Sequence, residues 1–432
     1  MKKYIFTVFA VAAVLSSCSK SLELNEDINS GAEAITTIGA STEISTRAVV
    51  SSSDNTKVLW QDGDQLGVLG ANSSPVARNL AYTLDGVGGS TTGTFKNETS
   101  DITAISAVMY PYQENATWAN GKLTCEIPSV QKATEGSFDK DAAIMYSIGN
   151  TINVQLNYAV NFLKVTVSET NVHAISISSS DALSGKMEIT SSGVTEASSG
   201  SLKAVTLIPA TGDVLPTGDY YIAVKAGNIA NPTISYVYYN DDHTATEKTK
   251  AGSGTLTFAE GTNVKSISVN WTGATERKAF QLWENGPYFA EYNVGASSAS
   301  EEGNTTTYAE ATAENFIWGP NWCTPSKADM EHLMTAAKGQ TDEKVKCEYT
   351  QEGSSTYGFK FTGLTDGYAS NSVFFPAQGG DSYDGEAFYW SGTADGSRAW
   401  SMFLNYNYGF WDSDWRSGFQ DYNCLVRPVL KN

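Results

Sequence analysis

The C-terminal part of the chain contains a stretch in which aromatic and small polar residues are interspersed. It runs from Asn405 to Tyr422 and combines Tyr, Trp and Phe with Asn, Asp, Ser, Gly and one Arg. Rigid rings supply contact area at little entropic cost, and short polar side chains adapt their hydrogen bonds to a ligand. Flat rings also stack on sugars. We therefore predict a ligand-binding surface whose candidate residues are Tyr406, Tyr408, Trp411, Asp412, Asp414, Trp415, Arg416 and Tyr422.

The alternative is that half of these aromatic residues alternate inward and form the core of a small, loop-rich fold. We expect both arrangements, with some rings in the core and others exposed. Asp412 and Asp414 flank Ser413, but two carboxylates make a thin calcium site, because Ca²⁺ takes six to eight oxygen ligands. The sequence therefore predicts no metal and no cofactor.

Catalytic signatures are missing from the chain. Its three histidines, His173, His243 and His332, are far apart in sequence, and none has a Cys or carboxylate at metal-ligand spacing. There is no Gly-Lys-Ser/Thr phosphate loop, no Gly-x-Ser-x-Gly elbow and no His-Glu-x-x-His motif. A glycosidase pair among the many carboxylates is not excluded by counting. We expect that the protein is not an enzyme.

The N-terminus predicts export. Lys2 and Lys3 precede an apolar run that is too short to span a bilayer and leads to Leu15-Ser16-Ser17-Cys18. This end resembles the lipobox of bacterial lipoproteins, which implies a signal peptide over residues 1–17 and lipid on Cys18. The alternative is an ordinary signal peptide with an incidental cysteine. A polar segment follows over residues 18–47, predicted to be a flexible leader or propeptide, and ends at Arg47, a candidate site for a trypsin-like protease.

The overall composition favours an acidic surface protein. Its formal net charge is −19 over 432 residues, which argues against nucleic acid or anionic lipid as a partner. Any membrane contact is therefore expected through the lipid anchor alone. Cys125, Cys323, Cys347 and Cys424 remain after Cys18; one bridge in the final third is possible, but the pairing cannot be deduced from sequence.

Short strands predominate from about residue 48. Residues 151–156 alternate between apolar and polar side chains, which predicts a half-buried strand, and residues 159–167 are mostly apolar, as in a strand buried on both faces. Further strands follow at sandwich-like spacing up to residue 271. Residues 273–279 are predicted to be a polar linker. One helix is predicted over 326–338, with Gly339 after its end.

Residues 19–272 resemble the fimbrillin family. The similar blocks are "TKVLWQDGDQLGVL", "MYPY", "LTCEIPSVQKATEGSFDKDAAIMYS", "LNYAVNFLKVTVSE", "GDYYIAVKAG" and "GTNVKSISVNW". The resemblance implies two tandem transthyretin-like β-sandwich subdomains, here over 48–158 and 159–272. It also implies a lipoprotein precursor that is cut after an arginine, for which Arg47 fits. Removal of the N-terminal strand would open a groove for a strand from a neighbouring pilin subunit.

Residues 280–432 resemble the Fibrobacter succinogenes major paralogous domain, which is related to the C-type lectin-like fold. The similar blocks are "EYNVGASS", "WGPNWCTPSKADMEHLM", "SVFFPAQG", "FYWSGT", "AWSMFLNYNYGFWDSDW" and "CLVRPVL". The resemblance implies an α+β domain that binds a ligand, and the sugar-binding triplets of calcium-dependent lectins are missing. Cys323 stands where the family has Arg.

Together these features predict a mostly β, surface-exposed protein of the cell outer membrane that is incorporated into fimbriae. We expect a tip adhesin that accepts a donor strand and binds a glycan or protein ligand. Because residue 271 leads directly into another domain, no obvious strand is left to donate. The alternatives are a surface lipoprotein that binds glycans without polymerising and, more remotely, a carbohydrate-active enzyme.

Overall fold

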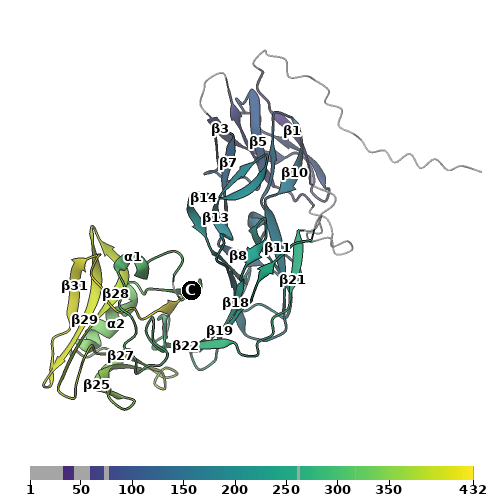
Figure 1. Ribbon diagram of the computed structural model, residues 1–432. Coiled ribbons are helices and arrows are strands. Elements are labelled where there is room, and N and C mark those ends of the chain that lie inside the picture. The colour runs from purple at the N-terminus through teal and green to yellow at the C-terminus, as the bar shows by residue number, and fades with distance from the viewer. Residues whose placement is uncertain (1–32, 43–58, 73–76, 260–262, 317, 432) are drawn as a thin grey trace, which may run out of the picture.

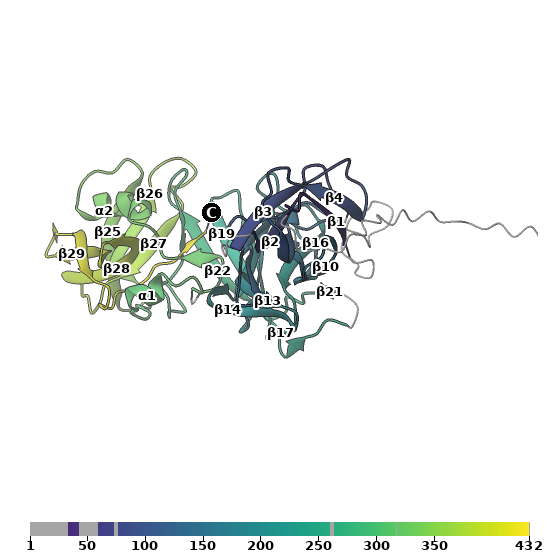
Figure 2. The ribbon, with the colours of Figure 1, turned by 90° about the horizontal axis from the view of Figure 1, so that it is seen from above.

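The computed structural model describes residues 33–42, 59–72, 77–259, 263–316 and 318–431, and shows a mostly β protein (Figure 1). The predicted fold class is confirmed in this respect. Cys18 and Arg47 lie outside the described residues. In the part of the chain that is described, no helix has both the length and the apolar character that crossing a membrane requires. The described chain has three regions: the first stands above the second in Figure 1, and the third lies to the side of the second (Figures 1 and 2).

The first region is a closed barrel, in which the strands are neighbours in the order β1-β10-β9-β5-β2-β3-β4. The bounds are β1 Thr37–Thr42, β2 Gln65–Ala71, β3 Ala77–Leu84, β4 Thr92–Lys96, β5 Ala104–Tyr110, β9 Met145–Ile148 and β10 Asn153–Tyr158. The side chains of β10 alternate between buried and exposed, as predicted. The barrel interior is filled by large side chains such as Trp60, Tyr82 and Phe95, which are almost fully buried.

Strand β1 corrects the prediction that residues 18–47 form a flexible leader. Its backbone pairs with β4 on one side and with β10 on the other, and Ile38 is fully buried. The polar composition around it concealed this role, because a barrel strand needs only its inward residues to be apolar. Small size also matters here: an added Cβ at Gly39 would lie 2.5 Å from Asn153 Oδ1.

The second region is built around β11, which is buried on both faces near its start, as predicted. Phe162 packs in the barrel cluster, and Leu163 faces a separate core between two sheets. One of these sheets has the order β16-β11-β21, with β11 Val160–Val167, β16 Gly218–Lys225 and β21 Val264–Ile267. A short 3-10 helix η1, Lys140–Ala142, and the strand pair β17 Ile229–Ala230 and β20 Thr255–Leu256 complete the connections.

The boundary predicted near residue 158 is crossed by strand pairing. Strands β7 and β8 precede it in the chain, yet β7 pairs with β13 and β8 pairs with β15, both of which follow it. The sheet that contains β7 has the order β14-β13-β7-β6, with β6 Thr117–Ala119, β7 Lys122–Ile127, β13 Ser184–Thr190 and β14 Gly193–Leu202. The first two regions are therefore joined by shared sheets.

A nine-stranded sheet extends from the second region into the third, in the order β24-β32-β23-β22-β19-β18-β12-β15-β8. Its bounds are β8 Val130–Ala133, β12 Val172–Ser178, β15 Ala204–Pro209, β18 Thr233–Tyr239, β19 Thr244–Ala251, β22 Thr275–Gln281, β23 Tyr288–Ala290, β24 Trp322–Cys323 and β32 Val429–Leu430. The C-terminal strand β32 thus returns to the junction between the second and third regions (Figure 1).

Strand β22 corrects the prediction of a linker over 273–279. It pairs along β19 on one side and with β23 on the other. Its polar side chains suggested a loop, but the inward one, Arg277, lies opposite Glu247 and forms an ion pair with it at 3.3 Å. A strand can carry such a side chain because the neighbouring strand supplies the opposite charge.

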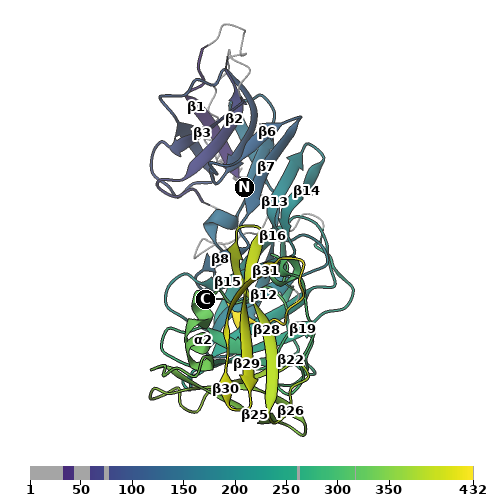
Figure 3. The same ribbon diagram turned by 90° about the vertical axis from the view of Figure 1, so that its left-hand side faces the viewer.

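The third region packs two further sheets around helix α2 (Figure 3). The remaining bounds are α1 Tyr308–Ala311, η2 Ala328–Met330, α2 Glu331–Ala337, β25 Val345–Glu352, β26 Thr356–Gly363, β27 Ser372–Pro376, β28 Asp384–Asp395, β29 Arg398–Asn407, β30 Phe410–Trp411 and β31 Asp414–Phe419. The predicted helix over 326–338 is thus shorter and begins with a 3-10 turn. Gly339 follows it at φ +70°, the left-handed conformation that ends many helices.

Candidate functional site

The aromatic stretch predicted to bind a ligand folds into strands β29, β30 and β31. In the pairing of β29 with β31, Met402 lies opposite Trp415 and Ser401 lies opposite Arg416. Side chains of opposed residues share a face of the sheet, and successive residues face opposite sides. The predicted single surface therefore divides between two faces and a hairpin tip.

One face is directed at helix α2 and is largely structural. Trp411, Trp415 and Tyr406 pack there against the hydrophobic core that contains Leu333 and Met334 of the helix. The indole of Trp415 donates a hydrogen bond to Glu331 Oε2 at 3.2 Å. These three rings are partly buried against the helix and contribute to the core of this region, as in the alternative in which the aromatic residues alternate inward. A role for them in binding a ligand stays a prediction.

Lys327 forms part of the same packing. Its ammonium lies 3.9 Å from the ring centre of Trp400 and 5.1 Å from that of Trp415. These two cation–π contacts hold strands β29 and β31 against the segment that precedes α2.

Asp414 and Asp412, the two carboxylates of the predicted surface, have different surroundings. Asp414 forms an ion pair with Lys338 Nζ at 2.9 Å, and its hydrogen bond with that lysine lowers the pKa of Asp414. Asp412 is exposed in the turn before β31. Within the described ranges, no group of three or more His, Cys, Asp and Glu side chains is arranged to hold a metal ion.

The hairpin tip carries exposed rings. Tyr408 is 68% exposed and adopts a positive φ of 47°. Its ring stacks on Tyr383 at 5.5 Å between centroids, and Phe410 beside it is 77% exposed. Tyr408 is therefore available to a partner, but it lies at the opposite end of β29 from Phe419, which pairs with Arg398 at the start of that strand.

The outer face, directed away from α2, contains a groove of about 690 Å³. It takes in Arg416 and Tyr422 of the predicted residues, together with residues that the sequence did not indicate. Those lining residues are Phe388, Trp390, Ser401, Phe403, Ser417, Gly418, Asp421, Asn423 and Cys424. The guanidinium of Arg416 lies 4.9 Å from the ring centre of Phe403, and Tyr422 is 56% exposed.

The groove has an aromatic floor and a polar rim. Trp390 is fixed in place because its indole donates to Thr306 O at 2.8 Å, and Phe388 packs on Phe403 at 4.7 Å between centroids. Arg416 and Asp421 are exposed and supply charges of both signs. Period-two alternation along β28 and β29 could have indicated the residues of this face, but the sequence alone does not say which face the helix covers.

No family model, curated protein or solved structure matches this chain.

The four cysteines after Cys18 are free thiols. The disulfide considered for the final third of the chain is therefore not formed. Cys125 and Cys424 are buried, and burial raises the pKa of each thiol to about 12. Cys424 borders the groove, and its raised pKa favours the protonated thiol.

Proposed function

We propose that the protein is a fimbrial adhesin of the cell outer membrane, exported as a lipoprotein precursor. In this proposal its first two regions act as the pilin module and its third region binds a glycan through the outer-face groove. The observation that carries the proposal is the position of β1, which lies between the lipidated end and Arg47 and yet completes the barrel.

A cut after Arg47 would separate β1 from the rest of the chain. The barrel would then present two unpaired strand edges, on β4 and β10, and would lose the buried side chains of Ile38 and Ala40. Such a gap is a template for β-strand addition. A strand from a neighbouring pilin that carried small and apolar side chains at the same alternate positions would fill it.

The course of the chain after the pilin module supports a place at the fibre tip. Strand β21 pairs in parallel with β11, and β22 follows it and pairs with β19. Both strands are thus bound within the subunit's own sheets, and neither is available for donation to another subunit.

The groove supports a glycan as the ligand. Sugars present apolar ring faces and hydroxyl edges, and the groove offers Tyr422 together with the charged groups of Arg416 and Asp421. This combination of apolar area with a few polar groups is typical of small-molecule sites.

The rival proposal is a surface lipoprotein that binds glycans and never polymerises. One observation favours it: with β1 in place, the described strands already close the barrel, and none of them leaves a free edge. The two proposals differ in whether β1 can be exchanged.

Strand exchange can be tested by placing a specific protease site in residues 43–50 of the full chain. The folded protein is cut there and mixed with a labelled peptide of residues 33–46. We expect the peptide to enter the cut protein and not the uncut one. A peptide with Ile38→Asp should fail, because it would bury a charge, whereas the matched Thr37→Asp peptide should enter. Equal uptake by cut and uncut protein, or no uptake by either, would contradict the exchange.

A further inference from the structure

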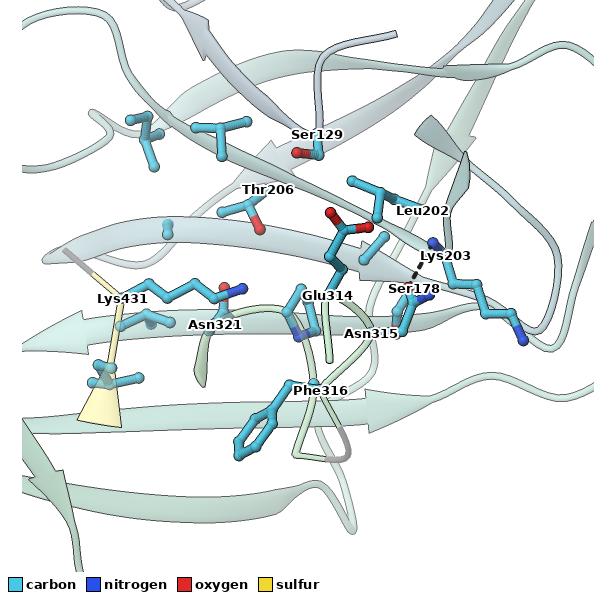
Figure 4. Close-up of a pocket in the computed structure, with 18 of the residues that line it drawn as sticks. Ser129, Ser178, Leu202, Lys203, Thr206, Glu314, Asn315, Phe316, Asn321 and Lys431 are labelled. Atoms are coloured by element: carbon cyan, nitrogen blue, oxygen red, sulfur yellow. Dashed lines mark hydrogen bonds between the residues drawn. The ribbon is translucent and has the colours of Figure 1, made fainter. Parts of the chain in front are cut away.

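A second cavity, of about 740 Å³, lies between the second and third regions (Figure 4). Its floor is one face of β12 and β15, where Ala174, Ser178, Ala204 and Thr206 present small side chains. Residues 314–316 and 319–321 of the third region form a wall. The cavity exists because small side chains continue along the sheet beyond the part that the third region covers.

Hydrogen bonds between the regions hold the wall in place. The backbone N–H of Lys203 donates to Asn315 Oδ1 at 3.0 Å. Asn321 donates from Nδ2 to Glu247 Oε1 at 2.9 Å, and its Oδ1 accepts from Ser176. A site whose walls are already fixed loses little conformational entropy when it binds a ligand.

Two charged side chains, Lys431 and Glu314, extend over the sheet into this space (Figure 4). Among the described residues, neither has an ion-pair partner. Lys431 remains exposed, but the protein around it lowers the pKa of its ammonium by partial desolvation. A partly desolvated cation with no counterion among the described residues gains from a bound anion, because the anion restores its lost solvation.

The remaining polar groups identify the rest of the ligand. Ser129, Ser178 and Thr206 bring hydroxyls to the lining, and the carboxylate of Glu314 accepts hydrogen bonds from hydroxyl donors. Val130, Ile208 and Leu430 supply apolar surface between them. A molecule that carries a carboxylate, several hydroxyls and apolar ring faces would match all three kinds of lining.

We propose that this cavity is a second binding site, which takes a carboxylated, uronic-acid-type oligosaccharide with its carboxylate on Lys431. The site is separate from the outer-face groove and does not depend on the proposed function. Because its walls come from both regions, an occupied cavity would also hold those regions together.

The test uses the full chain and a galacturonic acid trimer, with the fully methyl-esterified trimer as an uncharged match. Calorimetric titration should show binding of the acid and at least tenfold weaker binding of the ester. Lys431→Gln should weaken binding of the acid at least tenfold. Lys122→Gln removes an equal charge from the distant β7 and should leave it unchanged.

Three results would overturn the proposal: no binding of the acid, equal binding of acid and ester, or equal loss in the two lysine variants. The last would show that net charge alone attracts the ligand. Tyr422→Ala, in the outer-face groove, distinguishes this proposal from the proposed function. It should leave binding of the acid trimer intact, so a wrong assignment of the cavity and a wrong assignment of the groove give different results.

Discussion

Trp322 donates the hydrogen bond from its indole Nε1 to Glu247 Oε2 across 2.6 Å, joining the third region to a strand of the second. Glu247 is 1% exposed and also accepts from Asn321 and Arg277. A buried carboxylate with this many donors is a structural anchor. It fixes the third region to the second through side-chain hydrogen bonds between strands of the same sheet.

Glu247→Ala should therefore destabilise the whole chain. The substitution leaves the buried donors of Asn321 and Trp322 unpaired, while the half-buried guanidinium of Arg277 keeps its hydrogen bond to Trp318 O. We therefore expect a loss of about 2–4 kcal/mol in the free energy of unfolding. Urea denaturation followed by tryptophan fluorescence measures it. Glu276→Ala, at an exposed position on the adjacent strand, is the matched control and should change little. Equal effects of the two variants would mean that Glu247 is not an anchor.

Substitutions on the two faces of the β29–β31 sheet should separate stability from binding. Trp411→Ala and Trp415→Ala remove rings that pack on the core, so each should lower the free energy of unfolding by about 2–4 kcal/mol. Arg416→Ala and Tyr422→Ala alter exposed side chains and should leave the free energy of unfolding within about 0.5 kcal/mol of the wild-type value.

The same two groove variants should bind glycans more weakly. A glycan array should show at least tenfold weaker binding for Arg416→Ala and for Tyr422→Ala. Unchanged binding in both groove variants would exclude the groove as the glycan site.

Calcium should not contribute to stability or binding. Asp414 is already paired with Lys338, and Asp412 alone gives too few oxygens for the ion. Excess EDTA should leave the Tm and the glycan array pattern unchanged. A fall in Tm on adding EDTA, reversed by calcium, would show that a site has been missed.

Alkaline pH should destabilise the fold. Burial raises the pKa of Cys125, Cys424 and Tyr389 to about 12, above their ordinary values of 9 for thiols and 10 for the phenol. A raised folded-state pKa gives stability that is present below the unfolded-state pKa and is lost as the pH rises toward the folded-state value.

The urea midpoint under reducing conditions should therefore fall between pH 8 and pH 10.5. Cys125→Ala removes one of the three groups, and its midpoint should fall less over the same interval. A wild-type midpoint that does not change with pH would mean that these groups ionise equally well in the folded chain.

Much of the β architecture follows from periodicity, but the joins between regions do not. The alternation over 151–156 and the apolar run over 159–167 indicated β10 and β11, because a core imposes its spacing on the strands that cover it. Strands β1 and β22 were missed, since their stability comes from pairing with distant strands rather than from local composition. Only Arg416 and Tyr422 of the groove were predicted from the sequence. The other lining residues were missed because tertiary packing decides which face of β29 meets α2.

The most direct measurement is the N-terminus of the mature protein in fimbriae sheared from cells, determined by mass spectrometry. The proposed adhesin requires loss of the lipid and of β1 together, so the first residue should be Ala48. Acylated Cys18 as the N-terminus of every form of the protein would contradict strand exchange and leave the non-polymerising surface lipoprotein in its place.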